Sequence, residues 1–178
     1  MRVIGGKYRS RLLNAPKGRN TRPTLDKVKE SIFNIIGPRI DGSIVLDLFS
    51  GSGGLGIEAL SRGASFAYFN DHDYSAYSCI KSNLESLKID QSFYELTKMD
   101  YKKRISTLEN KIDILFLDPP YKERIYQEII EKMKENNRLS EQAIIVIECE
   151  LDVEVELNDY SQREYRYGNK KLIILNLV

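Results

Sequence analysis

The 178-residue sequence has no tryptophan, one histidine and only two cysteines, Cys79 and Cys149. These residues do not have the spacing of a metal-ligand set, and two cysteines cannot build a disulfide framework. We therefore expect no metal site and two buried thiols in a reducing compartment. No apolar run approaches the roughly 18 residues that a membrane span requires. The first residues, Met1 to Gly6, also lack the apolar stretch of a signal peptide, so we expect a cytoplasmic protein without a membrane partner.

The net charge of +1 conceals a strong asymmetry along the chain. Residues 1–39 contain ten basic and two acidic residues, which gives +8, and the remainder carries −7. A basic segment on an acidic body favours binding to a polyanion, although many charged segments are only solvated surface. Acid-free residues 1–24, with Tyr8 among the basic side chains, favour nucleic acid. The candidate RNA-binding residues are Arg2, Lys7, Arg9, Arg11, Arg19 and Arg22.

The hydrophobic pattern predicts a single α/β unit. Glycines and prolines in residues 1–23 indicate a hairpin or an extended arm. Residues 24–178 form the α/β domain that follows this arm. Within it, apolar runs alternate with amphipathic segments, which is typical of a mostly parallel sheet with helices on both faces. The expected strands are 44–48, 65–70, 93–97, 112–117 and 143–148, followed by a C-terminal antiparallel hairpin of 164–167 and 171–177. The expected helices are 24–36, 54–62, 74–87 and 125–134.

A glycine-rich segment follows the first predicted strand. Gly51, Gly53 and Gly56 match the G-x-G-x-x-G pattern of loops that approach a nucleotide cofactor, and Asp71 ends the next strand, where a ribose-binding acid is expected. The pattern alone is weak, but its position between a strand and a helix favours a cofactor that contains adenosine. The candidate cofactor-binding residues of this region are Asp47, Phe49, Gly51, Ser52, Gly53 and Asp71.

Asp47 bears on the choice of cofactor. A carboxylate just before the loop would repel the pyrophosphate of a dinucleotide, whereas it suits the ammonium group of S-adenosylmethionine. The alternative is that Asp47 only caps the turn, as aspartate often does. We favour S-adenosylmethionine, with S-adenosylhomocysteine as the product.

A second motif, Asp118-Pro119-Pro120-Tyr121, ends the most apolar predicted strand. In open α/β sheets ligands bind at such strand ends. The Asp118 carboxylate and the Pro119 carbonyl can hold the two protons of an exocyclic base amine, and Tyr121 can stack on an extruded base. A strand-ending turn with a surface tyrosine is the alternative, but the glycine loop upstream argues against it. The candidate catalytic residues are Asp118, Pro119 and Tyr121.

Two weaker features complete the candidate site. Asp100 and Tyr101 follow a predicted strand where an adenine amine and ring could be met, although aspartate is common in turns. His72 and Cys79 have no partner that suggests nucleophilic catalysis, so we assign them no role.

Three segments make the chain resemble the bacterial 16S rRNA (guanine-N2)-methyltransferase family. They are residues 2–11 with Arg22-Pro23-Thr24, residues 46–60, and residues 116–121. The resemblance implies a Rossmann-like class I methyltransferase domain over residues 24–178 with a seven-stranded sheet, and a basic arm, residues 1–23, that meets rRNA. It also implies cofactor contacts by Gly51, Gly53 and Asp71, an adenine contact by Asp100, and guanine contacts by Asp118 and Tyr121. The family's longer glutamate is expected where Asp71 stands, which leaves the reach of the ribose contact open.

The sequence thus predicts methyl transfer from S-adenosylmethionine to a guanine N2 amine of 16S rRNA. We expect a monomer that acts on the small (30S) subunit particle. An adenine-N6 methyltransferase acting on DNA or RNA is the nearest alternative, because its target is also an exocyclic amine. An NAD-dependent oxidoreductase and a catalytically inactive RNA-binding module are the alternatives from other classes.

Overall fold

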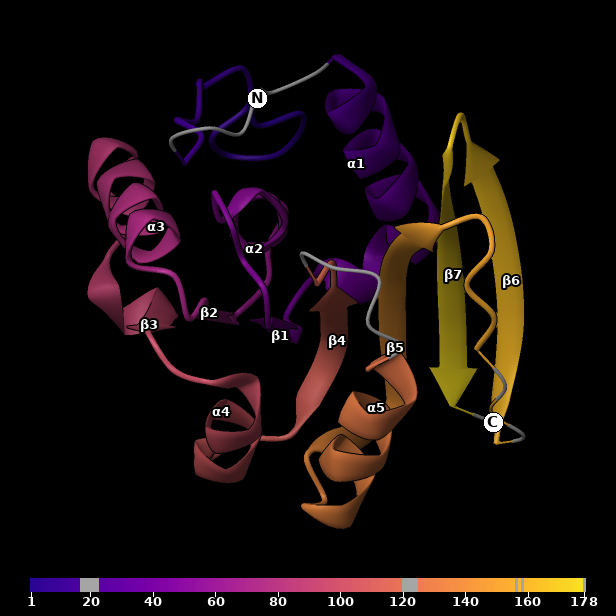
Figure 1. Cartoon of the computed structure of the whole chain (residues 1–178). Coiled ribbons are helices and arrows are strands. Elements are labelled where there is room, and N and C mark those ends of the chain that lie inside the picture. The colour runs from indigo at the N-terminus through magenta and orange to yellow at the C-terminus, as the bar shows by residue number, and fades with distance from the viewer. Residues whose placement is uncertain (17–22, 120–124, 156, 158, 178) are drawn as a thin grey trace.

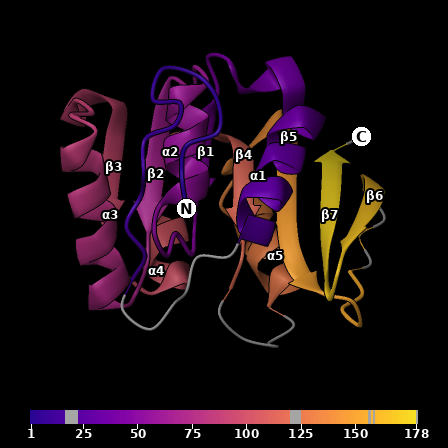
Figure 2. The ribbon, with the colours of Figure 1, turned by 90° about the horizontal axis from the view of Figure 1, so that it is seen from above.

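The computed structural model describes residues 1–16, 23–119, 125–155, 157 and 159–177. Its core is one seven-stranded sheet in the order β3-β2-β1-β4-β5-β7-β6 (Figures 1 and 2). The strands are β1 Ile44–Asp47, β2 Phe66–Asn70, β3 Tyr94–Thr97, β4 Ile112–Leu117, β5 Leu139–Glu150, β6 Tyr160–Tyr167 and β7 Lys170–Leu177. The helices are α1 Pro23–Ile36, α2 Gly54–Ser61, α3 Tyr74–Ser86, α4 Tyr101–Thr107 and α5 Tyr126–Glu135, with short 3-10 helices η1 Gly37–Ile40 and η2 Gln91–Phe93.

Strands β1 to β5 are parallel, and β7 pairs antiparallel with both β5 and β6. The chain leaves β1 toward β2 on one side and returns to β4 on the other. The sheet therefore has its topological switch point between β1 and β4, where open α/β sheets bind ligands at the carboxyl ends of the strands. The predicted fold class is confirmed.

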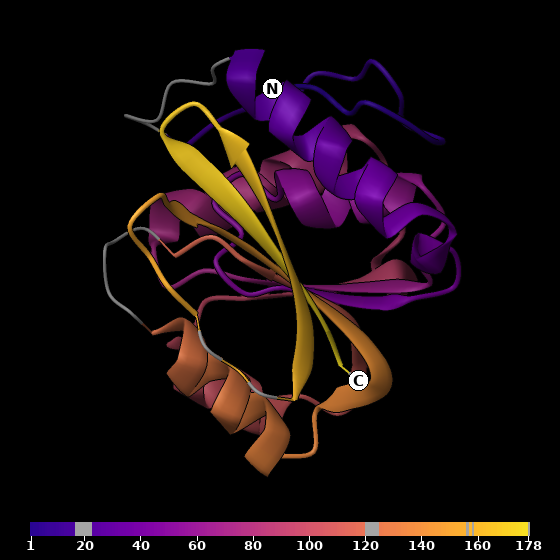
Figure 3. The ribbon, with the colours of Figure 1, turned by 90° about the vertical axis from the view of Figure 1, so that its right-hand side faces the viewer.

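Two hydrophobic clusters cover the two faces of the sheet. On one face, α1, α2 and α3 contribute Val28, Ile57 and Ile80. On the other face, α4 and α5 contribute Ile105 and Ile129 (Figure 1). Residues from β1, β4 and β5 alternate between the two clusters, as expected for strands buried on both sides. The β6–β7 hairpin forms one end of the twisted sheet and faces the viewer in Figure 3, with helical layers on either side of the sheet.

The largest differences between the observed and the predicted elements are one helix and the starts of two strands. Helix α4 was not predicted, because its seven residues are too few to display a helical period. Strand β5 begins at Leu139 rather than Ala143, and β6 begins at Tyr160 rather than Glu164. The added residues are mostly polar, because they lie toward one edge of the sheet, and a hydrophobic pattern does not mark them.

The N-terminal residues form a small hairpin-like turn. Backbone hydrogen bonds join Val3 N to Arg11 O and Leu13 N to Met1 O, both at 2.9 Å. Arg2 and Leu12 form an isolated antiparallel β-bridge. Val3 and Leu13 are buried in the same cluster as α1 and α2. These residues therefore pack on the body of the protein. Over the described part of the chain, no helix is both long and apolar enough to cross a membrane.

Candidate active site at the carboxyl edge of the sheet

The loop between β1 and α2 has the geometry that its glycines predict. Gly51 and Gly53 have φ values of 55° and 78°, a region that L side chains rarely adopt. A Cβ on Gly56 would lie 2.3 Å from a ring carbon of Phe69, so this position must be glycine for α2 to pack on β2. The three glycines therefore shape the turn and bring the N-terminus of α2 close to the sheet.

Asp47 lies at the start of this loop and is 3% exposed. Its Oδ2 accepts a hydrogen bond from Gly56 N at 3.1 Å, so the predicted turn-capping contact is present. Burial raises the pKa of Asp47 to about 7, the Gly56 bond opposes this rise, and the nearby carboxylates of Asp118 and Asp71 add to it. Asp47 therefore lies near carboxylates of the same charge, and no cation is among the groups that shift its pKa.

Asp71 joins the second strand to the same loop. Its Oδ2 accepts from Gly51 N at 3.0 Å and its Oδ1 accepts from Asp73 N at 3.0 Å. Asp73 instead caps helix α3 through Ser75 N and Ala76 N. The two acids that the sequence offers here thus have separate positions: Asp71 faces the glycine loop and Asp73 starts a helix.

Phe49 and Tyr101 form an aromatic pair beside the loop, with ring centroids 5.8 Å apart. The Tyr101 hydroxyl donates to Glu128 on α5 at 3.3 Å. Asp100 is the N-cap of α4, and its Oδ1 accepts from Lys102 N at 2.8 Å. The cap uses one carboxylate oxygen of this exposed residue, and the ring pair offers an apolar surface next to it.

Ser52 contacts the N-terminal turn and α3. Its hydroxyl lies 3.8 Å from the Met1 sulfur, and its carbonyl accepts from Asn83 Nδ2 at 2.9 Å. Both contacts connect the back of the loop to the N-terminal turn and to α3. These contacts hold Ser52 in place, and its predicted contact with the cofactor stays a prediction.

Asp118 and Pro119 follow the last residue of β4, at the carboxyl edge of the sheet. Asp118 is exposed and Pro119 is buried. In the parallel pairing, Asp47 is opposite Phe116, so Asp118 lies two residues beyond Asp47 on the neighbouring chain segment. Its charge raises the pKa of Asp47, which places the two motifs in one site. Pro120 and Tyr121 lie outside the described residues.

Glu148 is a site residue to which the sequence interpretation assigned no role. Ile147 is opposite Leu117 in the parallel β4–β5 pairing, so Glu148 is beside Asp118 in register. Burial raises the pKa of Glu148 to about 7, Asp118 adds to the rise, and Lys170 opposes it. The sequence does show that Glu148 is a charged residue at the end of the apolar run 143–147. The hydrophobic pattern does not show which residue of β4 lies beside it.

The N-terminal turn is held by a second residue that sequence reasoning missed, Glu58 on α2. Its carboxylate is fully buried and accepts from Ile4 N and Gly5 N, each at 2.8 Å. It also pairs with Arg62 at 2.8 Å and with Lys29 at 3.3 Å. Burial lowers the pKa of Lys29, and the ion pair with Glu58 opposes this. Lys29 thus stabilises the turn and adds nothing to the basic surface.

The candidate RNA-binding residues of the turn are at the surface. Arg2, Lys7, Arg9 and Arg11 are exposed. Arg2 lies 3.7 Å from the carboxylate of Asp26, and Arg11 donates to Ser86 O at 3.0 Å. Arg19 and Arg22 lie outside the described residues. Within the ranges that the structure covers, no group of three or more His, Cys, Asp or Glu side chains could hold a metal ion.

Comparison with known proteins identifies the family. The family profile described as "Conserved hypothetical protein 95" matches residues 1–176. The chain is 37% identical to "Ribosomal RNA small subunit methyltransferase D" of Haemophilus influenzae over 85% of this chain and 80% of that protein. It is 35% identical to the protein of the same name from Escherichia coli K12, over 85% of this chain and 76% of that one.

Solved structures agree with this relationship. The yhhF protein of Escherichia coli superposes with a TM-score of 0.87 and 31% identity, covering 99% of this chain and 97% of that one. The SMU.776 protein, solved in complex with SAH, superposes with a TM-score of 0.70 at 17% identity, over 88% of this chain and 50% of that one, and shares the fold. The chain belongs to the family described as "Conserved hypothetical protein 95", and its resemblance to the small-subunit rRNA methyltransferases is confirmed.

Proposed function

We propose that this protein transfers a methyl group from S-adenosylmethionine to the N2 amine of a guanine in 16S rRNA. The observation that carries the proposal is the convergence of Asp47, Asp71 and Asp118 at the switch point of the sheet, beside a glycine loop. The names of the two small-subunit relatives support rRNA as the substrate. We further propose that the substrate is the small-subunit particle, and that the enzyme acts as a cytoplasmic monomer.

The residues at this edge fit a cationic cofactor. Burial raises the pKa of Asp47 there, and the charges of Asp118 and Asp71 add to the rise, so a positively charged ligand would relieve the repulsion on Asp47. S-adenosylmethionine carries an ammonium and a sulfonium group and supplies a methyl group on the positively charged sulfur. A dinucleotide would bring the negative charges of a pyrophosphate to the same carboxylates, which makes the oxidoreductase alternative unfavourable.

Each cofactor-binding residue has a distinct role in this proposal. Asp71 has lone pairs left on both oxygens to accept from ribose hydroxyls, since a carboxylate offers about four acceptor sites. The Phe49–Tyr101 pair provides an apolar surface for the adenine ring, and the second oxygen of Asp100 accepts from the adenine amine. Asp47 places a negative charge near the ammonium group of the cofactor, and Gly51 and Gly53 let the backbone of the loop approach that group closely.

Asp118 and Pro119 handle the nucleophile. The lone pair of an exocyclic amine is delocalised into the base, so the nitrogen must be held with its protons on acceptors. The Asp118 carboxylate and the Pro119 carbonyl are the acceptors, and the fixed φ of proline restricts the position of that carbonyl. Tyr121 stacks on the extruded base.

After methyl transfer the amine nitrogen carries a positive charge and must lose one proton. Glu148 lies beside Asp118 and has a pKa raised to about 7, so it can accept that proton near neutral pH. Two carboxylates in one site also favour uptake of a proton, because it removes their mutual repulsion. We propose that the Asp118–Glu148 pair takes up the proton that the amine releases.

Nucleoside mass spectrometry of rRNA from cells with and without the protein tests the proposed function. Loss of N2-methylguanosine from the small-subunit rRNA, and its return with the wild-type gene, is the expected result. Loss of N6-methyladenosine would support the adenine alternative instead. No change in any methylated nucleoside would refute methylation of rRNA.

A further inference from the structure

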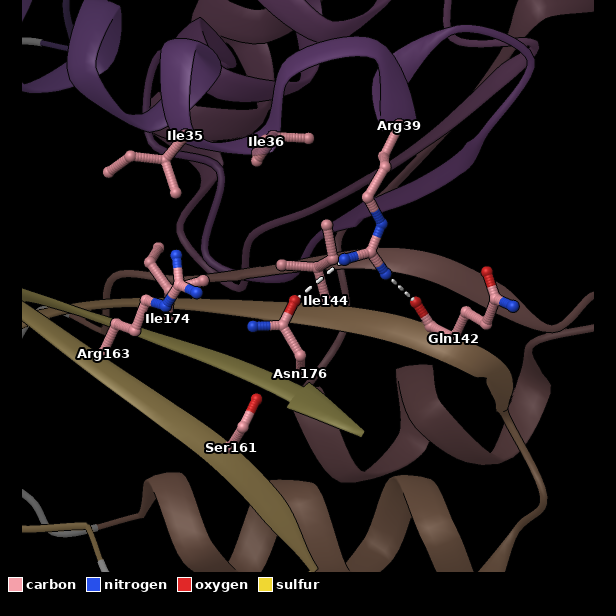
Figure 4. Close-up of a pocket in the computed structure, with 9 residues that line it drawn as sticks. All are labelled: Ile35, Ile36, Arg39, Gln142, Ile144, Ser161, Arg163, Ile174 and Asn176. Atoms are coloured by element: carbon pink, nitrogen blue, oxygen red, sulfur yellow. Dashed lines mark hydrogen bonds between the residues drawn. The ribbon is translucent and has the colours of Figure 1, made fainter. Parts of the chain in front are cut away.

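A second site lies away from the carboxyl edge, between the C-terminal end of α1 and the β6–β7 hairpin. Here the structure has a pocket of about 450 Å³ (Figure 4). This volume is within the range of small-ligand sites, roughly 300–1,000 Å³. The pocket is lined by Ile35, Ile36, Arg39, Gln142, Ile144, Ser161, Arg163, Ile174 and Asn176.

The lining combines an apolar surface with two positive charges. Figure 4 shows Arg39 and Arg163 on either side of Ile144. Arg39 is oriented by neutral acceptors, Asn176 Oδ1 at 2.9 Å and the Gln142 carbonyl. The lining contains no carboxylate, and across the described residues neither arginine forms an ion pair. Two arginines without acidic partners favour an anionic occupant.

One face of the β6–β7 hairpin runs from the pocket toward the candidate active site. Alternate residues of β6 share a face, so Tyr167, Tyr165 and Arg163 form a row. Tyr165 is opposite Leu172, and Leu172 is opposite Glu148, so this tyrosine is level with the catalytic edge. Arg163, two residues before Tyr165 on the same face, is the member of this row that lines the pocket. No residue of β6 on this face between 161 and 167 is acidic.

The distance between the two sites suits one strand of nucleic acid. Ile144 in the pocket and Glu148 at the edge lie on the same face of β5, four residues apart, which is roughly 13 Å at about 3.3 Å per residue. Aromatic rings next to basic side chains form a surface that suits single-stranded nucleic acid, because the bases stack on the rings and the phosphates pair with the cations.

We propose that the pocket and the adjoining row of Arg163, Tyr165 and Tyr167 form a groove that binds a nucleotide of the RNA strand that flanks the target base. Arg163 and Arg39 hold its phosphate through charge-assisted hydrogen bonds, and the isoleucines contact its ribose or base. Tyr165 and Tyr167 line the path of the strand toward Asp118. The inference rests on the proposed function, since it requires an RNA substrate, and it adds a contact surface distant from the basic N-terminal turn.

Steady-state methyl transfer by the full-length protein tests this groove, with small-subunit rRNA and 30S particles from cells that lack the protein as two separate substrates. We compare Arg163→Ala with Arg166→Ala, which removes the same charge from the opposite face of β6. Arg163→Ala should raise the KM for RNA roughly three- to tenfold and lower the salt slope of binding by about 1, with an unchanged kcat. Arg163→Lys should recover part of the affinity.

The controls separate this inference from the proposed function. Both arginines are exposed, so neither variant should alter folding, and the affinity for S-adenosylmethionine should stay at the wild-type value. Equal KM values for Arg163→Ala and Arg166→Ala on both substrates, with active wild-type enzyme, would overturn the groove proposal alone. Absence of RNA methylation by the wild-type protein would instead contradict the proposed function.

Discussion

The carboxyl edge of the sheet and the N-terminal turn both bring charged groups together, but they treat charge in opposite ways. At the edge, Asp118 lies near both Asp47 and Glu148, and these two residues have pKa values raised to about 7. In the turn, the buried carboxylate of Glu58 is satisfied by two backbone amides and two cations. The first arrangement stores repulsion that a ligand can relieve, whereas the second only holds the structure together.

The largest effect is expected at Asp118. Asp118→Ala should lower kcat by roughly a thousandfold or more, because the amine loses its charged acceptor. The affinity for S-adenosylmethionine should change little. Single-turnover methyl transfer and calorimetric binding measure the two quantities, with Glu109→Ala, an exposed carboxylate just ahead of β4, as the control. Wild-type turnover in the Asp118 variant would contradict the mechanism.

Glu58 should matter most for stability. Glu58→Ala leaves Lys29 without its partner and removes the acceptor of two amides, which should cost roughly 3–5 kcal/mol of unfolding free energy. Denaturant unfolding measures this loss, and Glu135→Ala on the exposed surface of α5 should leave stability unchanged. Equal stability of the two variants would show that the buried carboxylate does not anchor the turn.

The buried charge of Asp47 should lower the stability of the cofactor-free protein and strengthen cofactor binding. Its folded pKa is above its unfolded value, so the folded state binds more protons between about pH 4 and 7, and stability falls as pH rises through that window. Asp47→Asn keeps an acceptor for Gly56 N and should stabilise the free protein at pH 8 by roughly 2–4 kcal/mol. It should also weaken binding of S-adenosylmethionine.

Thermal unfolding at pH 5 and pH 8, with and without S-adenosylmethionine, measures both consequences. The variant should show a smaller loss of stability between the two pH values than the wild type. A variant that is destabilised at pH 8, or that binds the cofactor as well as the wild type, would show that Asp47 is only a turn cap.

Glu148 should control the pH dependence of the chemical step. With saturating S-adenosylmethionine, kcat should rise with pH through about 7 as Glu148 loses its proton. Asp118 raises this pKa and Lys170 lowers it, so both remain unchanged in the test. Glu148→Gln should reduce kcat roughly 10- to 100-fold and remove this rise. An unaltered pH profile in the variant would exclude Glu148 as the proton acceptor.

The smallest effect is expected in the turn's exposed cations. Arg9→Ala should weaken RNA binding only a few-fold and lower the salt slope by about 1. Filter binding across a salt series measures this change, and the affinity for S-adenosylmethionine should be constant. A salt slope identical to that of the wild type would remove Arg9 from the RNA surface.

The parallel core of the fold was predictable because its strands are nearly continuous apolar runs. The glycine loop was predictable because its positive φ values and its contact with Phe69 require glycine. Helix α4 was not, since much of its sequence is charged and its burial depends on Arg104 and Ile105 alone. Local sequence contains little information about such a short helix.

The site was predictable where one segment carries the chemistry and not where separate segments meet. Asp47 and Asp118 end strands that the pattern identifies. Glu148 acquires its role only from the β4–β5 register, and Glu58 from partners at Ile4 and Lys29 that are distant in sequence. Pairings of this kind are tertiary, so hydrophobic periodicity does not reveal them.

The most direct test of the central claim is in vitro methylation of small-subunit particles from cells that lack the protein. The purified protein is supplied with S-adenosylmethionine that carries a labelled methyl group, and the RNA is digested to nucleosides. We predict label in N2-methylguanosine with the wild-type protein and none with Asp118→Ala. Label in N6-methyladenosine, or equal labelling by both proteins, would contradict it.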